Sequence, residues 1–164
     1  MKSTIKVKGL VDEDFVNYKS PSMFIALGHC NWKCCVEANI PITICQNSEL
    51  ANVKEIEVPV SEIYHRYSQN SITEAIVIGG LEPFTKTDEV FSIIDFFRRN
   101  GCQDTFVIYT GFYEYEISYI ITLLKKFGNV IVKFGRFVPN SEKIYDNVLG
   151  VWLASDNQYA ERIS

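Results

Sequence analysis

The sequence predicts an α/β domain with a mainly parallel sheet. Three short apolar runs, 75–78, 105–109 and 130–134, alternate with amphipathic stretches. Strands that alternate with helices of about a dozen residues are typical of parallel βαβ units. With 164 residues, 47% of them hydrophobic, the chain is long enough to bury one core, so we expect a single domain, 1–164.

The N-terminal part is expected to be extended. Residues 5–11 and 23–27 have the apolar content of strands and are joined by an acidic, turn-rich segment, 12–21. Residues 1–8 alternate polar and apolar side chains and lack the apolar stretch of a signal peptide. We therefore predict a strand there and no targeting segment.

Caps and apolar periodicity predict three helices, at 61–67, 87–100 and 114–127. Thr87 can cap the second helix, and Gly101 can end it. Helices between the apolar runs would cover the sheet and complete its core.

Charge and hydropathy exclude several function classes. The formal charge of −4 argues against nucleic acid as a partner, because binding a polyanion needs clustered Lys and Arg. No uninterrupted apolar stretch approaches the ~18 residues that a membrane span needs. We expect a cytoplasmic protein, in which clustered cysteines hold metal more often than they form disulfides.

Four of the five cysteines fall within residues 30–45, at Cys30, Cys34, Cys35 and Cys45. Thiolates at this density are typical of a metal site or an iron-sulfur cluster. Adjacent cysteines rarely bind one ion together, so one of Cys34 and Cys35 is expected to be spare. Pro41 and its β-branched neighbours argue against a helix between these cysteines.

Three interpretations of the cysteines remain open. Three thiolates on a four-iron cluster would leave one iron free for a chelating small molecule. A structural zinc would use Cys30, Cys34 and Cys45 with either Cys35 or His29. The cysteines could also cluster without a ligand. No Ser/His/Asp set is apparent, so no side chain is assigned a catalytic role.

A second unusual segment, Gly79-Gly80-Leu81-Glu82-Pro83, follows a buried strand. Paired glycines let a ligand approach the backbone, although a tight turn is the commoner reason for them. The carboxyl ends of parallel strands meet at one edge of a sheet, where ligands bind. We expect this segment, 109–111, 135–137 and the cysteine segment to share that edge.

These motifs together resemble the radical S-adenosylmethionine enzymes. The Cys-x-x-x-Cys start followed by a strand ending Gly-Gly-Leu-Glu-Pro is similar to the family's cysteine and GGEP motifs. Tyr109-Thr110-Gly111, Gly135-Arg136-Phe137 and Ser155-Asp156-Asn157-Gln158 are similar to segments of one subfamily, the activating proteins of anaerobic ribonucleotide reductases. The resemblance implies a compact partial (β/α) barrel of the radical S-adenosylmethionine type.

Residue by residue, the resemblance implies a 4Fe-4S cluster on Cys30, Cys34 and Cys45. The residues implied to bind S-adenosylmethionine are Ile44 against the adenine, Gly79, Gly80 and Glu82 near the methionine amino group, and Tyr109 and Thr110 near the ribose or carboxylate. The chain departs from the family's spacing, because ten residues rather than two separate Cys34 from Cys45. Cys35 replacing Cys34 as a ligand therefore stays open.

The resemblance also implies a reaction and partners. An electron from the reduced cluster would cleave S-adenosylmethionine to methionine and a 5′-deoxyadenosyl radical. That radical would abstract hydrogen from a glycine of a glycyl radical enzyme, the anaerobic ribonucleoside-triphosphate reductase. A flavodoxin-like or other low-potential reductant would supply the electron. The alternatives are a small iron-sulfur electron-transfer protein and a zinc-stabilised binding module.

Overall fold

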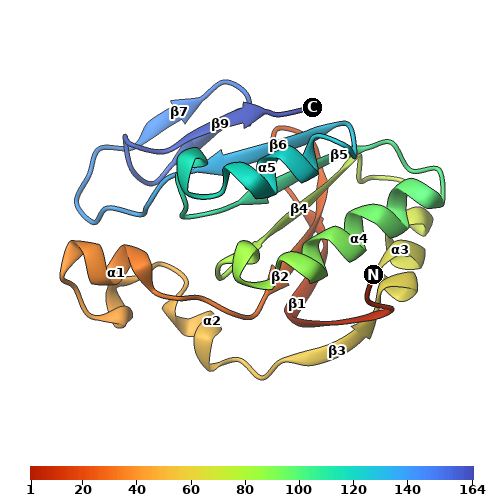
Figure 1. Ribbon diagram of the computed structural model, residues 1–164, viewed down its shortest axis with the longest axis horizontal. Coiled ribbons are helices and arrows are strands. Elements are labelled where there is room, and N and C mark those ends of the chain that lie inside the picture. The colour runs from red at the N-terminus through yellow and green to blue at the C-terminus, as the bar shows by residue number, and fades with distance from the viewer.

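The computed structural model, which describes residues 1–164, is built on one seven-stranded sheet (Figure 1). The strand order is β3-β1-β2-β4-β5-β6-β9, and β7 pairs with β8 in a separate hairpin. The strands are β1 Thr4–Asp14, β2 Ser22–Leu27, β3 Ile56–Pro59, β4 Ala75–Gly80, β5 Thr105–Tyr109, β6 Val130–Phe134, β7 Ile144–Asp146, β8 Val151–Leu153 and β9 Tyr159–Arg162.

Five α-helices and three 3-10 turns connect the strands. The α-helices are α1 Lys33–Ala38, α2 Ser48–Asn52, α3 Val60–Gln69, α4 Thr87–Arg99 and α5 Ser118–Leu124. The 3-10 turns are η1 Ile42–Ile44, η2 Pro83–Lys86 and η3 Glu114–Glu116. Figure 1 shows α1 and α2 together at one end of the molecule and α3 at the other. No helix has both the length and the apolar character needed to cross a membrane.

The sheet confirms the predicted α/β class. Strands β2, β4, β5 and β6 are parallel neighbours, whereas β1 and β9 pair antiparallel to the strands beside them. Because β3 is antiparallel to β1, it runs in the same direction as β2. Five of the seven strands therefore share one direction, with β3 and β9 as the open edges.

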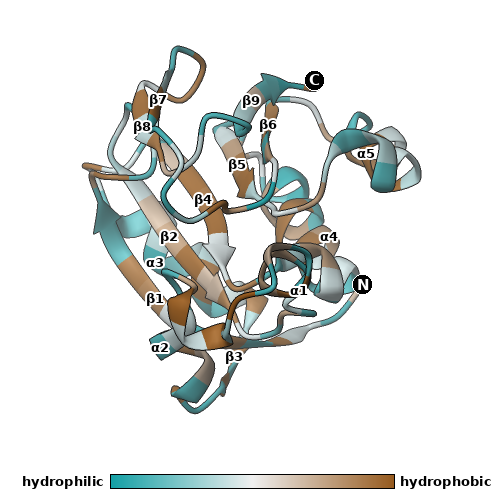
Figure 2. Cartoon of the chain, turned by 90° about the vertical axis from the view of Figure 1, so that its left-hand side faces the viewer, coloured by the Kyte–Doolittle hydropathy of each residue, from teal (hydrophilic) through white to brown (hydrophobic).

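Alternate residues of the parallel strands point to opposite faces, and each face has its own core. Figure 2 shows the hydrophobic residues that run along β2 and β4. The larger core packs α3, α4 and α5 against one face, with Phe97 of α4 in contact with Phe106 of β5. The smaller core joins Val77, Val107 and Ile131 to Leu149 and to the hairpin, so the second face is covered less completely.

Two sequence predictions fail around the helices. The cysteine segment was expected to lack a helix, but α1 contains Cys34 and Cys35, and η1 follows Pro41. Pro41 precedes η1 as its N-cap, where a proline costs no helix hydrogen bond. The single helix expected over 114–127 is instead η3 followed by the shorter α5, because the backbone at Ile117 leaves the helical region between them.

The sequence did not predict four of the strands. Strands β3, β7, β8 and β9 have only three or four residues each, and β7 is largely exposed. Such short runs carry no clear period, and their pairing depends on contacts with distant parts of the chain.

Candidate functional site

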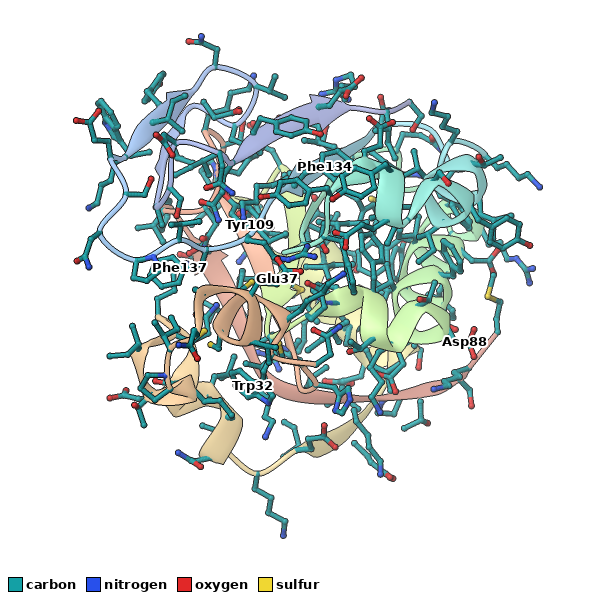
Figure 3. The ribbon with its side chains drawn as sticks, turned by 60° about the vertical axis from the view of Figure 1, so that its left-hand side comes forward. Trp32, Glu37, Asp88, Tyr109, Phe134 and Phe137 are labelled. Atoms are coloured by element: carbon teal, nitrogen blue, oxygen red, sulfur yellow. The ribbon has the colours of Figure 1, made fainter.

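A cavity of about 250 Å³ lies at the carboxyl ends of the parallel strands, on the face that the smaller core covers. It is lined by eight of the nine residues assigned from sequence to the site: Cys30, Cys34, Cys45, Gly79, Gly80, Glu82, Tyr109 and Thr110. The cysteine segment, which follows β2, reaches the same edge of the sheet as predicted. Figure 3 shows Glu37 on the side of α1 nearest Tyr109 and Phe137, with Trp32 on the opposite side.

Strand register places these residues together. Leu27 and Gly80 pair as the last residues of β2 and β4, and Tyr109 of β5 pairs with Lys133 of β6. Gly79, Tyr109 and Lys133 lie on the same face because side chains alternate along each strand. The parallel sheet thus puts the polar side chains of Tyr109 and Lys133 beside the open backbone of Gly79 in one wall.

Two glycines make room at this wall. Gly80 has φ of +88°, and a Cβ there would lie 3.0 Å from the Ala26 backbone. A Cβ at Gly111 would lie 3.1 Å from Cys34 Sγ and 3.4 Å from Glu82 Oε2. Both positions therefore need glycine, the first for its conformation and the second for the close approach of the thiol.

Backbone hydrogen bonds join the cysteine segment to the end of β4. The Glu82 amide donates to the His29 carbonyl at 2.6 Å, and the Leu81 amide donates to the Leu27 carbonyl at 3.1 Å. The Trp32 amide donates to Cys30 Sγ at 3.2 Å. Cys30 is thus held beside the end of β4, where the chain leaves the sheet.

The thiols differ in their surroundings. Burial raises the pKa of Cys30 to about 11 and also raises the pKa of Cys34. Both thiols are protonated at neutral pH without a metal, and a bound metal would displace those protons. Cys35 is buried, only 2% exposed, and lines a neighbouring pocket with Trp32 and Pro41 rather than this cavity. Of the adjacent pair, Cys34 lines the cavity, whereas Cys35 does not, although it lies beside Cys45.

The three cavity thiols do not converge on one point. No group of three or more His, Cys, Asp or Glu side chains in the structure is arranged to hold a single metal ion. Zinc needs thiolates at about 2.3 Å from one centre, so a zinc site here would need the thiols to come closer together. Thiolates on a cluster bind separate irons and can stand further apart.

Glu82 is almost fully buried, and its carboxylate joins the ends of two strands. Oε1 accepts hydrogen bonds from Thr110 Oγ1 at 2.7 Å and from the Phe84 amide at 3.1 Å, and Oε2 accepts from the Gly111 amide at 2.8 Å. Burial raises the pKa of this carboxyl. The three donors hold the carboxylate against the cavity wall.

Lys133 supplies the cavity's buried positive charge. Its ammonium donates to the Gly135 carbonyl at 3.2 Å and lies 5.9 Å from the centre of the Tyr109 ring. Burial lowers the pKa of Lys133 to about 8, so most copies still carry the charge at pH 7. A buried ammonium with one hydrogen bond retains two donors for a ligand.

No family model matches the chain, and neither does any curated protein.

One residue assigned from sequence is placed elsewhere. Ile44, at the end of η1, is 49% exposed and does not line the cavity. It directly precedes Cys45, which does line the cavity. The expected contact of Ile44 with an adenine ring stays a prediction.

Sequence reasoning did not single out Lys133 or Arg136 as functional. Lys133 could have been noticed because it is the only charged residue in the buried run Val130–Phe134. Arg136 stands within the Gly135-Arg136-Phe137 motif, but its partners Glu37 and Glu116 lie far away in the chain and could not be predicted.

The guanidinium of Arg136 lies between two carboxylates beside the cavity. It contacts Glu116 through two hydrogen bonds of 2.7 Å and Glu37 through two of 3.0 and 3.1 Å. Lys33 also pairs with Glu116. Hydrogen bonds from Arg136 lower the pKa of Glu116 from an ordinary value of 4.5 to about 2. Burial alone would raise this pKa, but its effect is smaller.

This shift predicts a defined acid sensitivity. The unfolded chain takes up a proton on Glu116 near pH 4.5, whereas the folded protein does so only near pH 2. The stabilisation from ionised Glu116 is therefore complete above about pH 4.5 and is lost as the pH falls towards about 2. Urea unfolding should show that Glu116→Gln is less stable than the wild type near neutral pH and that this difference shrinks across the window.

The exposed Glu49 of α2 is a suitable control, because its substitution to Gln makes the same change in charge. The Glu49→Gln protein measures the effect of losing one carboxylate charge elsewhere on the surface. A difference for Glu116→Gln that is the same at about pH 6 and about pH 2.5 would contradict the assignment.

Proposed function

We propose that this protein is a radical S-adenosylmethionine enzyme that holds a 4Fe-4S cluster on Cys30, Cys34 and Cys45. The observation that carries the proposal is that these three thiols line the same cavity as the Gly79–Glu82 strand end and the buried Lys133. A cluster site and a polar small-molecule site would then be one continuous space. We further propose that the open sheet is a partial barrel of this enzyme type.

The residues present fit such a cluster. Soft thiol ligands suit iron-sulfur clusters, and three of them leave one iron without a protein ligand. Gly111 leaves space directly beside Cys34, where any larger residue would crowd the thiol. The fourth nearby thiol, Cys35, lies beside Cys45 but does not line the cavity, so we propose Cys34 as the ligand and keep an electron carrier with four cysteine ligands as the less well supported alternative.

The chain's own groups suit the charged ends of S-adenosylmethionine. The ammonium of Lys133 would pair with the ligand's carboxylate, and a charge-assisted bond of this kind is strong in a buried site. Glu82, already accepting three hydrogen bonds, has capacity for one more from an amino group. Gly79 and Gly80 leave the strand end open to the ligand, and Tyr109 forms the wall beside them.

The bound cofactors would supply the electron transfer that cleaves S-adenosylmethionine into methionine and a 5′-deoxyadenosyl radical. The protein's part is to orient the ligand and to exclude water around it. As the recipient we propose a glycyl radical enzyme, with an anaerobic ribonucleoside-triphosphate reductase as the first candidate. A flavodoxin-like or other low-potential protein would be the reductant.

The first prediction concerns the cysteines. Anaerobic reconstitution with iron and sulfide should give about four irons per chain, and the reduced protein should release 5′-deoxyadenosine from S-adenosylmethionine. Alanine at Cys30, Cys34 or Cys45 should abolish both, because each removes one of three ligands. Iron analysis and chromatography of the products measure these outcomes.

Cys35→Ala is the matched control, since it removes the adjacent thiol that does not line the cavity. It should keep both the iron and the product. Loss of the cluster in Cys35→Ala would overturn the ligand assignment, and a reconstituted wild type that releases no 5′-deoxyadenosine would overturn the enzyme proposal.

The second prediction concerns Lys133. Lys133→Met replaces the side chain by an unbranched one that is a single atom shorter and has no charge, so the cluster should still assemble. The dissociation constant for S-adenosylmethionine should rise by roughly 10- to 100-fold, which corresponds to one lost charge-assisted hydrogen bond. Equilibrium binding to the reconstituted protein measures the change.

Lys143→Met on the exposed segment before β7 is the control and should bind as the wild type does. If both substitutions leave the dissociation constant unchanged, Lys133 does not bind the ligand.

A further inference from the structure

The buried guanidinium of Arg136 joins three segments that are distant in the chain. Its side chain is only 5% exposed, and it bonds Glu37 of α1, Glu116 of η3 and the Gly111 carbonyl after β5. The rings of Phe112 and Tyr113 lie 5.7 and 5.1 Å from its charged carbon. Arginine suits this position because its planar fork can serve two carboxylates at once.

Helix α1 contributes little to its own stability. It has only six residues, no side-chain cap at its first turn, and left-handed residues at both ends. Its only buried residue is Cys35, while Val36 is 73% exposed. A helix this short is unstable by itself and depends on tertiary contacts. Two ion pairs connect α1 to other segments, Lys33 with Glu116 and Glu37 with Arg136.

The same contacts determine where Cys34 lies. Cys34 and Glu37 are three residues apart in α1 and therefore share one face of the helix. Cys34 Sγ packs against Gly111, whose carbonyl accepts from Arg136 and whose amide donates to Glu82. Arg136 thus fixes both the helix that carries the thiol and the peptide against which the thiol rests.

We propose that Arg136 is a positioning residue that holds Cys34 in place at the cavity wall through its pair with Glu37. The role of Cys34 as a cluster ligand rests on the proposed function, whereas the attachment of α1 does not. Arg136 touches neither the cavity's ligand nor a reacting atom in this account. It acts through the position of the thiol.

The first arm of the test uses the protein without a cluster. Glu37→Gln breaks the attachment at a half-exposed side chain and leaves Arg136 paired with Glu116, so the fold should survive. Hydrogen exchange at the amides of α1 should become roughly tenfold faster, while the amides of β4 and β5 stay as in the wild type. The Glu49→Gln control, with the same change in charge, should leave α1 unchanged.

The second arm uses the reconstituted protein. Iron release to a chelator should be several-fold faster in Glu37→Gln than in Glu49→Gln, and the resonance spectrum of the reduced cluster should change. A general loss of stability would not alter the spectrum of the molecules that remain folded. Arg136→Lys should behave like Glu37→Gln, because lysine keeps the charge but cannot bridge both carboxylates.

Each result has a clear meaning. Unchanged α1 exchange in both Glu37→Gln and Arg136→Lys would overturn the attachment. Faster exchange with unchanged iron release and an unchanged spectrum would overturn the effect on Cys34. A wild type that takes up no cluster would defeat the proposed function and the ligand role of Cys34, while the exchange experiment would still decide whether Arg136 holds α1.

Discussion

The carboxylate of Glu82 is the interaction on which the cavity depends. It ties the end of β4 to the end of β5 through Thr110 and Gly111, and its own amide ties the cysteine segment to the same point. Burying a carboxylate is costly unless donors surround it, and here three donors do. Glu82 therefore connects the sheet, the glycine-rich turn and the segment that carries Cys30.

Two buried cations complete this arrangement from the next strand. Lys133 faces the cavity from the end of β6, and Arg136 lies just beyond it, between the cavity wall and α1. The first retains hydrogen-bond donors for a ligand, whereas the second is fully paired with Glu37 and Glu116. Lys133 and Arg136 are only three residues apart, yet the first is available to a ligand and the second holds α1 in position.

The sequence revealed the parts of this site that depend on local pattern. Buried runs such as 75–78 located the parallel strands, and their ends located Glu82 and Tyr109. The helical cysteine segment was missed because α1 is too short for a periodic signal and is held by Arg136, about a hundred residues away. The burial of Lys133 depends on strand register, and the exposure of Ile44 depends on a 3-10 turn; composition reveals neither.

The central claim is that the three thiols and the polar strand ends form a single site for a cluster and S-adenosylmethionine. Electron paramagnetic resonance of the reduced, reconstituted protein, recorded before and after addition of S-adenosylmethionine, tests this most directly. A cluster with one open iron in this cavity should change its spectrum when the ligand binds. A cluster whose spectrum ignores the ligand at saturating concentration would contradict the account.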